Sequence, residues 1–293
     1  MTFSEGWLSL REPADHAARS LSLTQAVFDA LSPAAPLRIL DLAAGTGSNL
    51  RYLTSGPAGG SAPAKGLVGA GPRARPEPSR RVRPNWLLVD HNPALLARVP
   101  ASPDVETRCL DLSTLEGCAI FEGRSLVTAS ALLDLVSEEW LRALAARCAG
   151  SGAAVLFALS YDGRVIWTPE DPDDAAVVAS VNEHQLTDKG FGPALGPDAT
   201  DVAARCFEGV GYRVRRAASD WLLTPESRAL QSQLIEGWAQ AATEMSPVRT
   251  RVIDGWRDRR LAHVAAGWSE ILVGHQDIGG ILGVEDFRVE DLN

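Results

Sequence analysis

Residues 39–49 read ILDLAAGTGSN, and this stretch decides the fold. The apolar residues up to Leu42 predict a short buried strand, and Gly45 and Gly47 predict a tight turn from that strand into a helix. Glycine accepts backbone angles that other residues resist, and the start of a helix presents free N–H groups to an anionic ligand. The stretch therefore predicts a cofactor-binding crevice at the carboxyl edge of a sheet. A dinucleotide fingerprint would have a third glycine at position 50, so Leu50 disfavours an enzyme that depends on NAD or FAD.

Strands and helices alternate along the chain around this stretch. Such alternation predicts parallel strands joined by right-handed crossovers, and hence a doubly wound, mostly parallel α/β sheet of seven strands with a Rossmann-like arrangement. Near-continuous apolar runs fit strands that are covered on both faces. The strands are expected at residues 37–42, 86–90, up to 109–111, 125–130, 153–159, 212–217 and 275–282.

Helical segments are expected before the sheet and within its last part. A single amphipathic helix from Pro13 to Leu31 predicts an N-terminal helical cover over residues 1–34. Helical patterns near 225–245 and 247–266 predict a helical lid insertion at 221–266. The sheet domain is then formed by residues 35–220 and 267–293.

Two long connections interrupt the sheet domain. Residues 54–84 are rich in Gly, Pro and Ala and carry six basic residues against one acid, which predicts a flexible basic insert. Residues 161–198 are polar and interrupted by Pro and Gly. Long connections inside a compact domain are commonly functional, so we expect a substrate loop at 161–198, with a solvated loop anchored by Phe191 as the alternative.

Four motifs along the first half of the chain resemble those of the class I S-adenosylmethionine-dependent methyltransferases. Residues 41–47, DLAAGTG, match the family's first motif. Asp90 matches the acid that holds the ribose hydroxyls of the cofactor, and Asp111 matches the acid beside the adenine amino group. Residues 128–134 resemble the fourth-strand motif, whose backbone lies near the methionine portion. The resemblance covers residues 35–160, and it departs from the family in the insert after the first helix.

The resemblance implies a set of residues that bind S-adenosyl-L-methionine. Arg19, like Arg11, would reach the carboxylate of the cofactor if the N-terminal helix closes over the site. From the residues alone, Asp90 could instead cap the helix at Pro93, and Asp111 could be an ordinary helix start. The candidate set is Asp41, Ala43, Gly45, Gly47, Asn49, Asp90, His91, Asp111, Leu112, Ser130 and Arg19.

Composition excludes several classes of protein. The chain has 293 residues and a formal net charge of −9, which argues against a protein whose main task is to bind nucleic-acid phosphates. It contains neither an apolar run long enough to span a membrane nor the pattern of a secretory signal. Four scattered cysteines form no CxxC pair, and the histidines and acids do not fall at metal-ligand spacings. We therefore expect a cytoplasmic protein without a bound metal.

The residues facing the methyl acceptor should come from segments over the carboxyl edge of the sheet. In the family the last strand runs antiparallel, which would bring its start, with His275 and Asp277, to the active edge. His184 and Tyr161, in or next to the expected substrate loop, are further candidates for catalytic groups. A neutral histidine at position 275 could act as a base, or it could simply satisfy a backbone carbonyl.

The sequence predicts a methyltransferase that moves a methyl group from S-adenosyl-L-methionine to an oxygen, nitrogen or carbon of a small-molecule metabolite. The chain lacks the tetrapeptide of amino-directed nucleic-acid enzymes and the Pro-Cys dipeptide of pyrimidine carbon methylation. One alternative is a methyltransferase that acts on RNA or protein through the basic insert; the other is a non-catalytic, regulatory protein that binds the cofactor. The apolar helices of the last third leave a homodimer possible.

Overall fold

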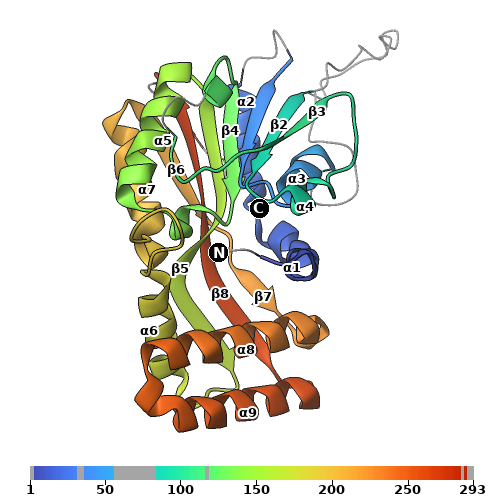
Figure 1. The fold of residues 1–293 in the computed structure, drawn as a ribbon, viewed down its shortest axis with the longest axis vertical. Helices are drawn as coiled ribbons and strands as arrows, with labels where there is room; N and C mark the ends of the chain where they lie inside the picture. Colours follow the sequence, from blue (N-terminus) through green and yellow to red (C-terminus); the bar gives the residue numbers. More distant parts are fainter. Residues whose placement is uncertain (1–2, 32–35, 56–83, 116–118, 285–286, 289–293) are drawn as a thin grey trace, which may run out of the picture.

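A computed structural model describes residues 3–31, 36–55, 84–115, 119–284 and 287–288. Within these residues the fold is built on an eight-stranded sheet with the order β3-β2-β1-β4-β5-β8-β6, and the short β7 pairs with β8 (Figure 1). The strands are β1 (Arg38–Leu42), β2 (Asn85–Asp90), β3 (Val105–Cys109), β4 (Leu126–Ser130), β5 (Ala154–Thr168), β6 (Tyr212–Ala218), β7 (Trp221–Leu223) and β8 (Glu270–Leu282).

The strand directions confirm the predicted doubly wound, mostly parallel α/β sheet. β1 pairs in parallel with both β2 and β4, so that Leu42 is opposite Val89 on one side and Ala129 on the other. β8 runs antiparallel to β5 and to β6. Among the described residues the three-residue β7 is an eighth strand, beyond the seven expected.

Helices cover both faces of the sheet (Figure 1). α5 and α7 pack on one face through apolar side chains such as Leu141, Leu144 and Phe207, and α2 and α3 pack on the other through Leu23 and Leu50. The α-helices are α1 (Glu5–Ala18), α2 (Leu21–Ala30), α3 (Ser48–Ser55), α4 (Pro93–Leu96), α5 (Glu138–Ser151), α6 (Asp174–Gln185), α7 (Ala199–Gly209), α8 (Arg228–Met245) and α9 (Thr250–Ala266). Short 3-10 turns are η1 (Ala119–Phe121), η2 (Leu133–Leu135), η3 (Gly196–Asp198), η4 (Pro225–Ser227) and η5 (Pro247–Arg249).

The N-terminal part contains two helices where the sequence predicted one helix from Pro13 to Leu31. α1 begins early because the Ser4 side chain caps it by accepting from the Trp7 N–H, so Pro13 lies inside the helix. The chain then breaks at Arg19, and the side chain of Ser20 caps α2 by accepting from the Leu23 N–H at 3.2 Å. The start of α2 is therefore a separate helix N-terminus in the middle of the predicted cover.

Residues 161–198 differ from the long loop that the sequence predicted. The first of them continue β5, which pairs with β8 as far as Thr168, opposite Glu270, and later ones form α6. Gly163, with a φ of +85°, lies in the irregular part of β5, where its register with β8 shifts. Val165 and Trp167 then alternate onto one buried face. β8 correspondingly begins at Glu270, five residues before the predicted start.

The extended ends of β5 and β8 carry a second core beyond the carboxyl edge of the parallel strands. α6, α8 and α9 contribute to it, and in Figure 1 α8 crosses the extended parts of these strands while α9 lies below α8. Trp167 lies at the centre of this core, in edge contact with Trp238 and Trp256 at centroid distances of 5.2 and 5.4 Å. This core forms the wall of the larger cavity described below.

Two features of the sequence cannot be compared with the structure, and a third concerns the membrane. Most of the basic insert at 54–84, and Cys118, lie outside the described residues. Among the helices that the structure describes, none is both long and apolar enough to cross a membrane.

Candidate functional site

The predicted glycine turn leads from β1 into α3 and contacts the end of β2. Gly45 and Gly47 have φ values of +54° and +82°, which glycine adopts without strain. The Gly45 N–H donates to Oδ2 of Asp90 at 2.8 Å, and the Asn92 N–H donates to Oδ1 of the same carboxylate, also at 2.8 Å. These two bonds hold the buried Asp90 carboxylate at the mouth of the turn.

A buried polar chain lies behind the turn. The Asn49 side-chain amide donates to Asp41 at 2.8 Å and to Thr128 at 3.0 Å, while its oxygen accepts from Nη1 of Arg19 at 2.9 Å. Burial raises the pKa of Asp41 to about 7, against the effect of the Asn49 bond. Oδ2 of Asp41 and Nη2 of Arg19 have no hydrogen-bond partner among the described residues. Asp41 therefore anchors Asn49 and still has an acceptor oxygen that is not used.

A cleft of about 140 Å³ lies over the turn, at the carboxyl edge of β1, β2 and β4. α1 closes it, because Leu8 lies against the turn: a Cβ added to Gly45 would be 3.2 Å from Cδ1 of Leu8. Arg51 of α3 bonds Glu12 of α1 at 2.6 Å and fastens this cover. Of the predicted cofactor residues, those that line the cleft are Asp41, Ala43, Asn49, Asp90, His91 and Ser130.

Other predicted cofactor residues do not line this cleft. Asp111 is exposed and accepts from the Ser113 N–H at 2.8 Å, a bond that lowers the pKa of its carboxyl. The carbonyl of the buried Leu112 accepts from Nε1 of Trp140. Arg19 is buried behind the cleft, with its guanidinium 4.4 Å from the centre of the Tyr52 ring. Gly45 and Gly47 shape the turn without being among the lining residues.

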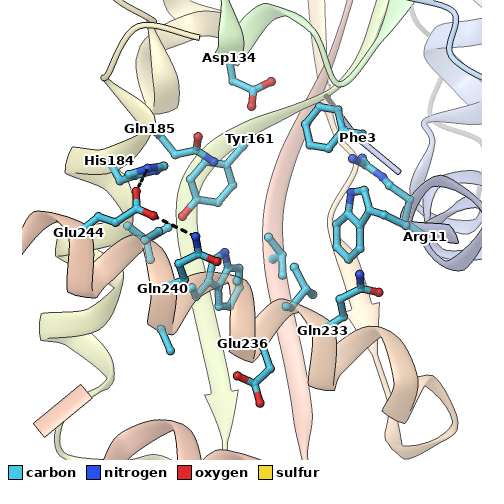
Figure 2. A pocket seen from close by; sticks show the side chains of 18 of the residues that line it. Phe3, Arg11, Asp134, Tyr161, His184, Gln185, Gln233, Glu236, Gln240 and Glu244 are labelled. Atoms are coloured by element: carbon cyan, nitrogen blue, oxygen red, sulfur yellow. Dashed lines mark hydrogen bonds and ion pairs between the residues drawn. The ribbon is translucent and has the colours of Figure 1, made fainter. Parts of the chain in front are cut away.

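A larger cavity of about 760 Å³ adjoins the cleft. Figure 2 shows side chains of α1, β5, α6 and α8 around it. Four residues line both hollows, so the two spaces meet along a shared wall: Phe3, Arg11, Ala131 and Leu135. Three of the four predicted catalytic residues line the larger cavity: Tyr161, His184 and His275.

His275 is buried beside Tyr161 and Trp221, with ring centroids 6.1 and 5.0 Å away. Its Nδ1 lies 3.0 Å from the carbonyl oxygen of Val273. A carbonyl only accepts, so Nδ1 carries the proton and Nε2 of the neutral ring is left as an acceptor. Burial lowers the pKa of His275 to about 3. The ring is therefore neutral at physiological pH and is a hydrogen-bond acceptor rather than an effective base.

Tyr161 and His184 already have partners. The Tyr161 hydroxyl donates to Oδ1 of Asn182 at 2.7 Å, and burial raises its pKa, so it remains protonated. Nε2 of His184 lies 3.2 Å from Glu244, and its Nδ1 lies 3.5 Å from the Lys189 ammonium. The Tyr161 hydroxyl can still accept a hydrogen bond from a ligand, whereas the contacts of His184 leave neither of its ring nitrogens free.

Asp277 lines neither the cavity nor the cleft, although the sequence placed it at the active edge. It is fully buried; its Oδ1 accepts from the Leu159 N–H and its Oδ2 from the Ser20 N–H, both at 2.9 Å. The carboxylate thus satisfies the N-terminus of α2 and a bulge of β5, where Leu159 has a φ of +56°. Its position is that of a structural anion.

Asp134 is a cavity residue that the candidate set did not include. It lies in η2, is 7% exposed, and its carboxylate points into the cavity in Figure 2. Its Oδ1 has no hydrogen-bond partner among the described residues, and burial raises its pKa to about 6. The fourth-strand motif ends at this residue, and that was the available signal. The described residues contain no cluster of His, Cys, Asp and Glu side chains suited to a metal ion.

Comparison with solved structures shows what fold the chain has. A cyclopropane-fatty-acyl-phospholipid synthase-like protein from Lactobacillus casei matches 93% of this chain and 91% of its own, with a TM-score of 0.50 and 13% identity. The cyclopropane synthase MmaA2 from Mycobacterium tuberculosis covers 95% and 94% at a TM-score of 0.47 and 11% identity. A SAM-dependent methyltransferase from Thiobacillus denitrificans in complex with S-adenosyl-L-homocysteine covers 96% and 100% at a TM-score of 0.42 and 12% identity.

The likeness to the first of these structures shows that the two chains share a fold. No protein-family model matches the sequence, and no curated protein matches it. What the site does must therefore be argued from its own residues.

Proposed function

We propose that this protein is a methyltransferase that binds S-adenosyl-L-methionine in the cleft over the glycine turn and methylates a small molecule in the adjoining cavity. The observation that carries the proposal is the wall shared by the two hollows. A cleft with an acid at the end of β2 meets a cavity of about 760 Å³. That volume lies in the range of roughly 300–1,000 Å³ typical of small-molecule sites.

The donor groups of the cleft fit the proposed cofactor. A carboxylate has about four acceptor sites, and the two backbone bonds to Asp90 leave two for the hydroxyls of a ribose. Gly45 and Gly47 leave the backbone bare where a ligand would pass over the turn. Nη2 of Arg19 and Oδ2 of Asp41 are unpartnered polar atoms nearby, although both are buried. The chemistry of the residues therefore supports a nucleoside ligand.

The cleft must widen to admit that ligand. Its volume of about 140 Å³ is below the roughly 300 Å³ at which ligand pockets begin. Phe3, Leu8 and Arg11, which belong to α1 or precede it, line the cleft and cover the turn. We infer that displacement of α1 opens the cleft, and that its return excludes water.

The cofactor would supply a methyl group that its sulfonium sulfur already activates. The task of the chain is then to hold the acceptor atom in line with that methyl group, which can supply several kcal/mol of the barrier. Tyr161 and His275 present a hydroxyl and an acceptor nitrogen to the cavity for orientation. Asp134, on the short turn between the two hollows, presents a carboxylate.

The test is calorimetric titration of the protein with S-adenosylmethionine and S-adenosylhomocysteine, repeated with Asp90→Ala. We expect micromolar binding in the unchanged protein and an affinity about tenfold to a hundredfold lower in the variant, since a hydrogen bond to a charged group contributes about 1.5–3 kcal/mol. Failure of both ligands to bind would refute the proposal. Binding without turnover on a broad panel of acceptors would favour a regulatory protein over an enzyme.

A further inference from the structure

We propose that the acceptor taken by the larger cavity is an amine with an apolar body, and that its nitrogen binds to the carboxylate of Asp134. This inference rests on the proposed methyltransferase function and specifies its substrate class. It is drawn from the charge, the burial and the aromatic lining of the cavity.

The lining charges favour a cation. Four carboxylates and two arginines line the part of the cavity that the structure describes. Arg11 is engaged with Asp15 through three hydrogen bonds of 2.9–3.1 Å. Arg257, the other arginine, bonds Asp254 and Asp258. An acceptor with a carboxylate or phosphate would thus meet mostly negative charge and guanidinium groups that already have partners. The carboxylates are Asp134, Glu236, Glu244 and Asp254.

Asp134 differs from the other three carboxylates in its depth. Side chains of Glu236, Glu244 and Asp254 are about half exposed, at 56%, 51% and 48%, whereas Asp134 as a residue is only 7% exposed. The Arg11 charge and the Tyr161 N–H act on the Asp134 carboxylate and oppose the rise of its pKa on burial, but its Oδ1 still has no hydrogen-bond partner among the described residues. A buried oxygen in this state is unfavourable unless a further donor or a cation reaches it. The three exposed acids already contact Arg257 or His184, whereas Asp134 has an oxygen without a partner and can hold a cation.

The position of Asp134 places that cation beside the cofactor cleft. Asp134 lies in η2, and its neighbour Leu135 lines both hollows, as does Ala131 just before η2. A nitrogen bound to Asp134 would therefore be at the junction from which a methyl group can be delivered. A carboxylate at the far end of the cavity could bind an amine but could not position its nitrogen for transfer.

The remaining walls fit the apolar body of such an acceptor. Phe3, Trp7, Tyr161, Trp221 and Trp238 line the cavity. Aromatic faces attract ammonium groups as well as apolar surface, by about 0.5–2 kcal/mol for each favourable contact. A neutral alcohol would gain the apolar contacts and could donate one hydrogen bond to Asp134, but it would bring no positive charge to that carboxylate.

The transfer step balances with the groups present. The acceptor enters as an ammonium, and one N–H proton passes to the Asp134 carboxylate and then to water. The lone pair of the nitrogen forms the bond to the methyl carbon while the methyl–sulfur bond breaks and its electron pair stays on sulfur. The sulfonium charge is thereby neutralised, and the methylated nitrogen becomes the cation. The raised pKa of Asp134 makes it a stronger base than an exposed carboxylate.

The experiment measures binding of matched ligands without the cofactor, by calorimetry. The ligands form three matched series, built on a phenylethyl, an indolylethyl or an octyl group. Within each series the same apolar group carries an ammonium, a hydroxyl or a carboxylate. We expect the amine of at least one series to bind about tenfold or more tightly than its alcohol, and the carboxylate to bind most weakly. Asp134→Asn should abolish the preference for the amine, whereas Glu208→Gln, which removes an exposed acid of α7, should preserve it.

The outcomes separate this inference from the proposed function. Equal binding of amine and alcohol by the unchanged protein, or no amine binding in any series, would overturn the amine proposal without the need for a variant. A separate titration with S-adenosylhomocysteine then tests the methyltransferase function. If that ligand binds while the amine preference is absent, the substrate class alone is wrong. If the amine preference is present while that ligand fails to bind, the methyltransferase function is wrong. Affinity of Asp134→Asn for S-adenosylhomocysteine also reports whether the variant is folded.

Discussion

Gly45 donates its backbone N–H to Oδ2 of Asp90 over 2.8 Å, so the turn after β1 and the end of β2 are held as one unit. This bond explains how a glycine and an acid 45 positions apart in the sequence form one edge of the cleft. The conformation of the turn and the position of the carboxylate should therefore depend on each other.

Gly45→Ala is expected to weaken binding of S-adenosylmethionine about tenfold and to destabilise the fold by about 1–2 kcal/mol. The positive φ disfavours a Cβ, and the new methyl group would be 3.2 Å from Leu8. Gly152→Ala is the matched control, because Gly152 also has a positive φ, +69°, and open space around its Cβ position. The control should lose similar stability and keep its affinity in calorimetry. Equal affinities of the two variants would contradict the role assigned to the turn.

Removal of the ion pair that fastens α1 should speed entry of the cofactor. Glu12 and Arg51 are partly buried, and their 2.6 Å contact joins α1 to α3. Pairs of this kind contribute about 0.3–1 kcal/mol, so Glu12→Gln should raise the association rate roughly twofold to fivefold. Stopped-flow tryptophan fluorescence measures the rate, with Asp29→Asn on α2 as the control. An unchanged rate would argue that α1 does not open the cleft.

Acid should destabilise the protein partly through His275. Its pKa is about 3 in the folded state and about 6.5 in the unfolded chain, so between these values the unfolded chain binds more protons. Stability is therefore lost as the pH falls through 6.5 towards 3, and linkage assigns about 2 kcal/mol of that loss to His275 between pH 7 and pH 5. Asp41 and Asp134, whose pKa values are raised, act in the opposite direction over this window.

The contribution of His275 is isolated by comparing pH dependences rather than absolute stabilities. His275→Asn keeps an amide that can donate to the Val273 carbonyl, but it does not titrate. Urea unfolding at pH 7 and pH 5 should show the unchanged protein losing about 2 kcal/mol more than the variant. Parallel losses would show that the imidazole protonates in the folded state.

The sequence predicted those parts of the site that depend on local chain geometry. In a parallel sheet the carboxyl ends of the strands, and the turns that follow them, lie at the same edge. The positions of Asp41 and Asp90 at that edge could therefore be predicted without knowledge of tertiary contacts. The positions of Asp277 and Asp134 depend on contacts between distant segments. Asp277 lies beneath the N-terminus of α2, at a point where the sequence pattern predicted an unbroken helix.

The second core shows the same dependence on distant contacts. Pro and Gly suggested a loop at 161–198, yet the alternation of Val165 and Trp167 becomes a buried face once β8 pairs with β5. That pairing joins residues about a hundred positions apart, and the short strand pattern gave no indication of its partner. The wall of the acceptor cavity could therefore not be predicted from the sequence.

Two adjacent arginines of α9 should contribute very differently to stability. Arg260 is fully buried, with Nε 2.9 Å from Asp174 and Nη1 2.5 Å from the Pro169 carbonyl, whereas the side chain of Arg259 is 46% exposed while it bonds Asp171. Arg260→Met leaves a largely buried carboxylate without its cation, so the free energy of unfolding in urea should fall by about 3–5 kcal/mol. Arg259→Met also removes the cation from a buried carboxylate, because the Asp171 side chain is 4% exposed, but Asp171 keeps the bond from the Asp173 N–H at 3.0 Å and the nearby charge of Arg260. The loss should therefore be smaller, about 1–2 kcal/mol. Because the damage in Arg260→Met comes from the stranded Asp174 charge, adding Asp174→Asn should recover part of the loss; equal losses for the two single variants, or no recovery, would contradict this account.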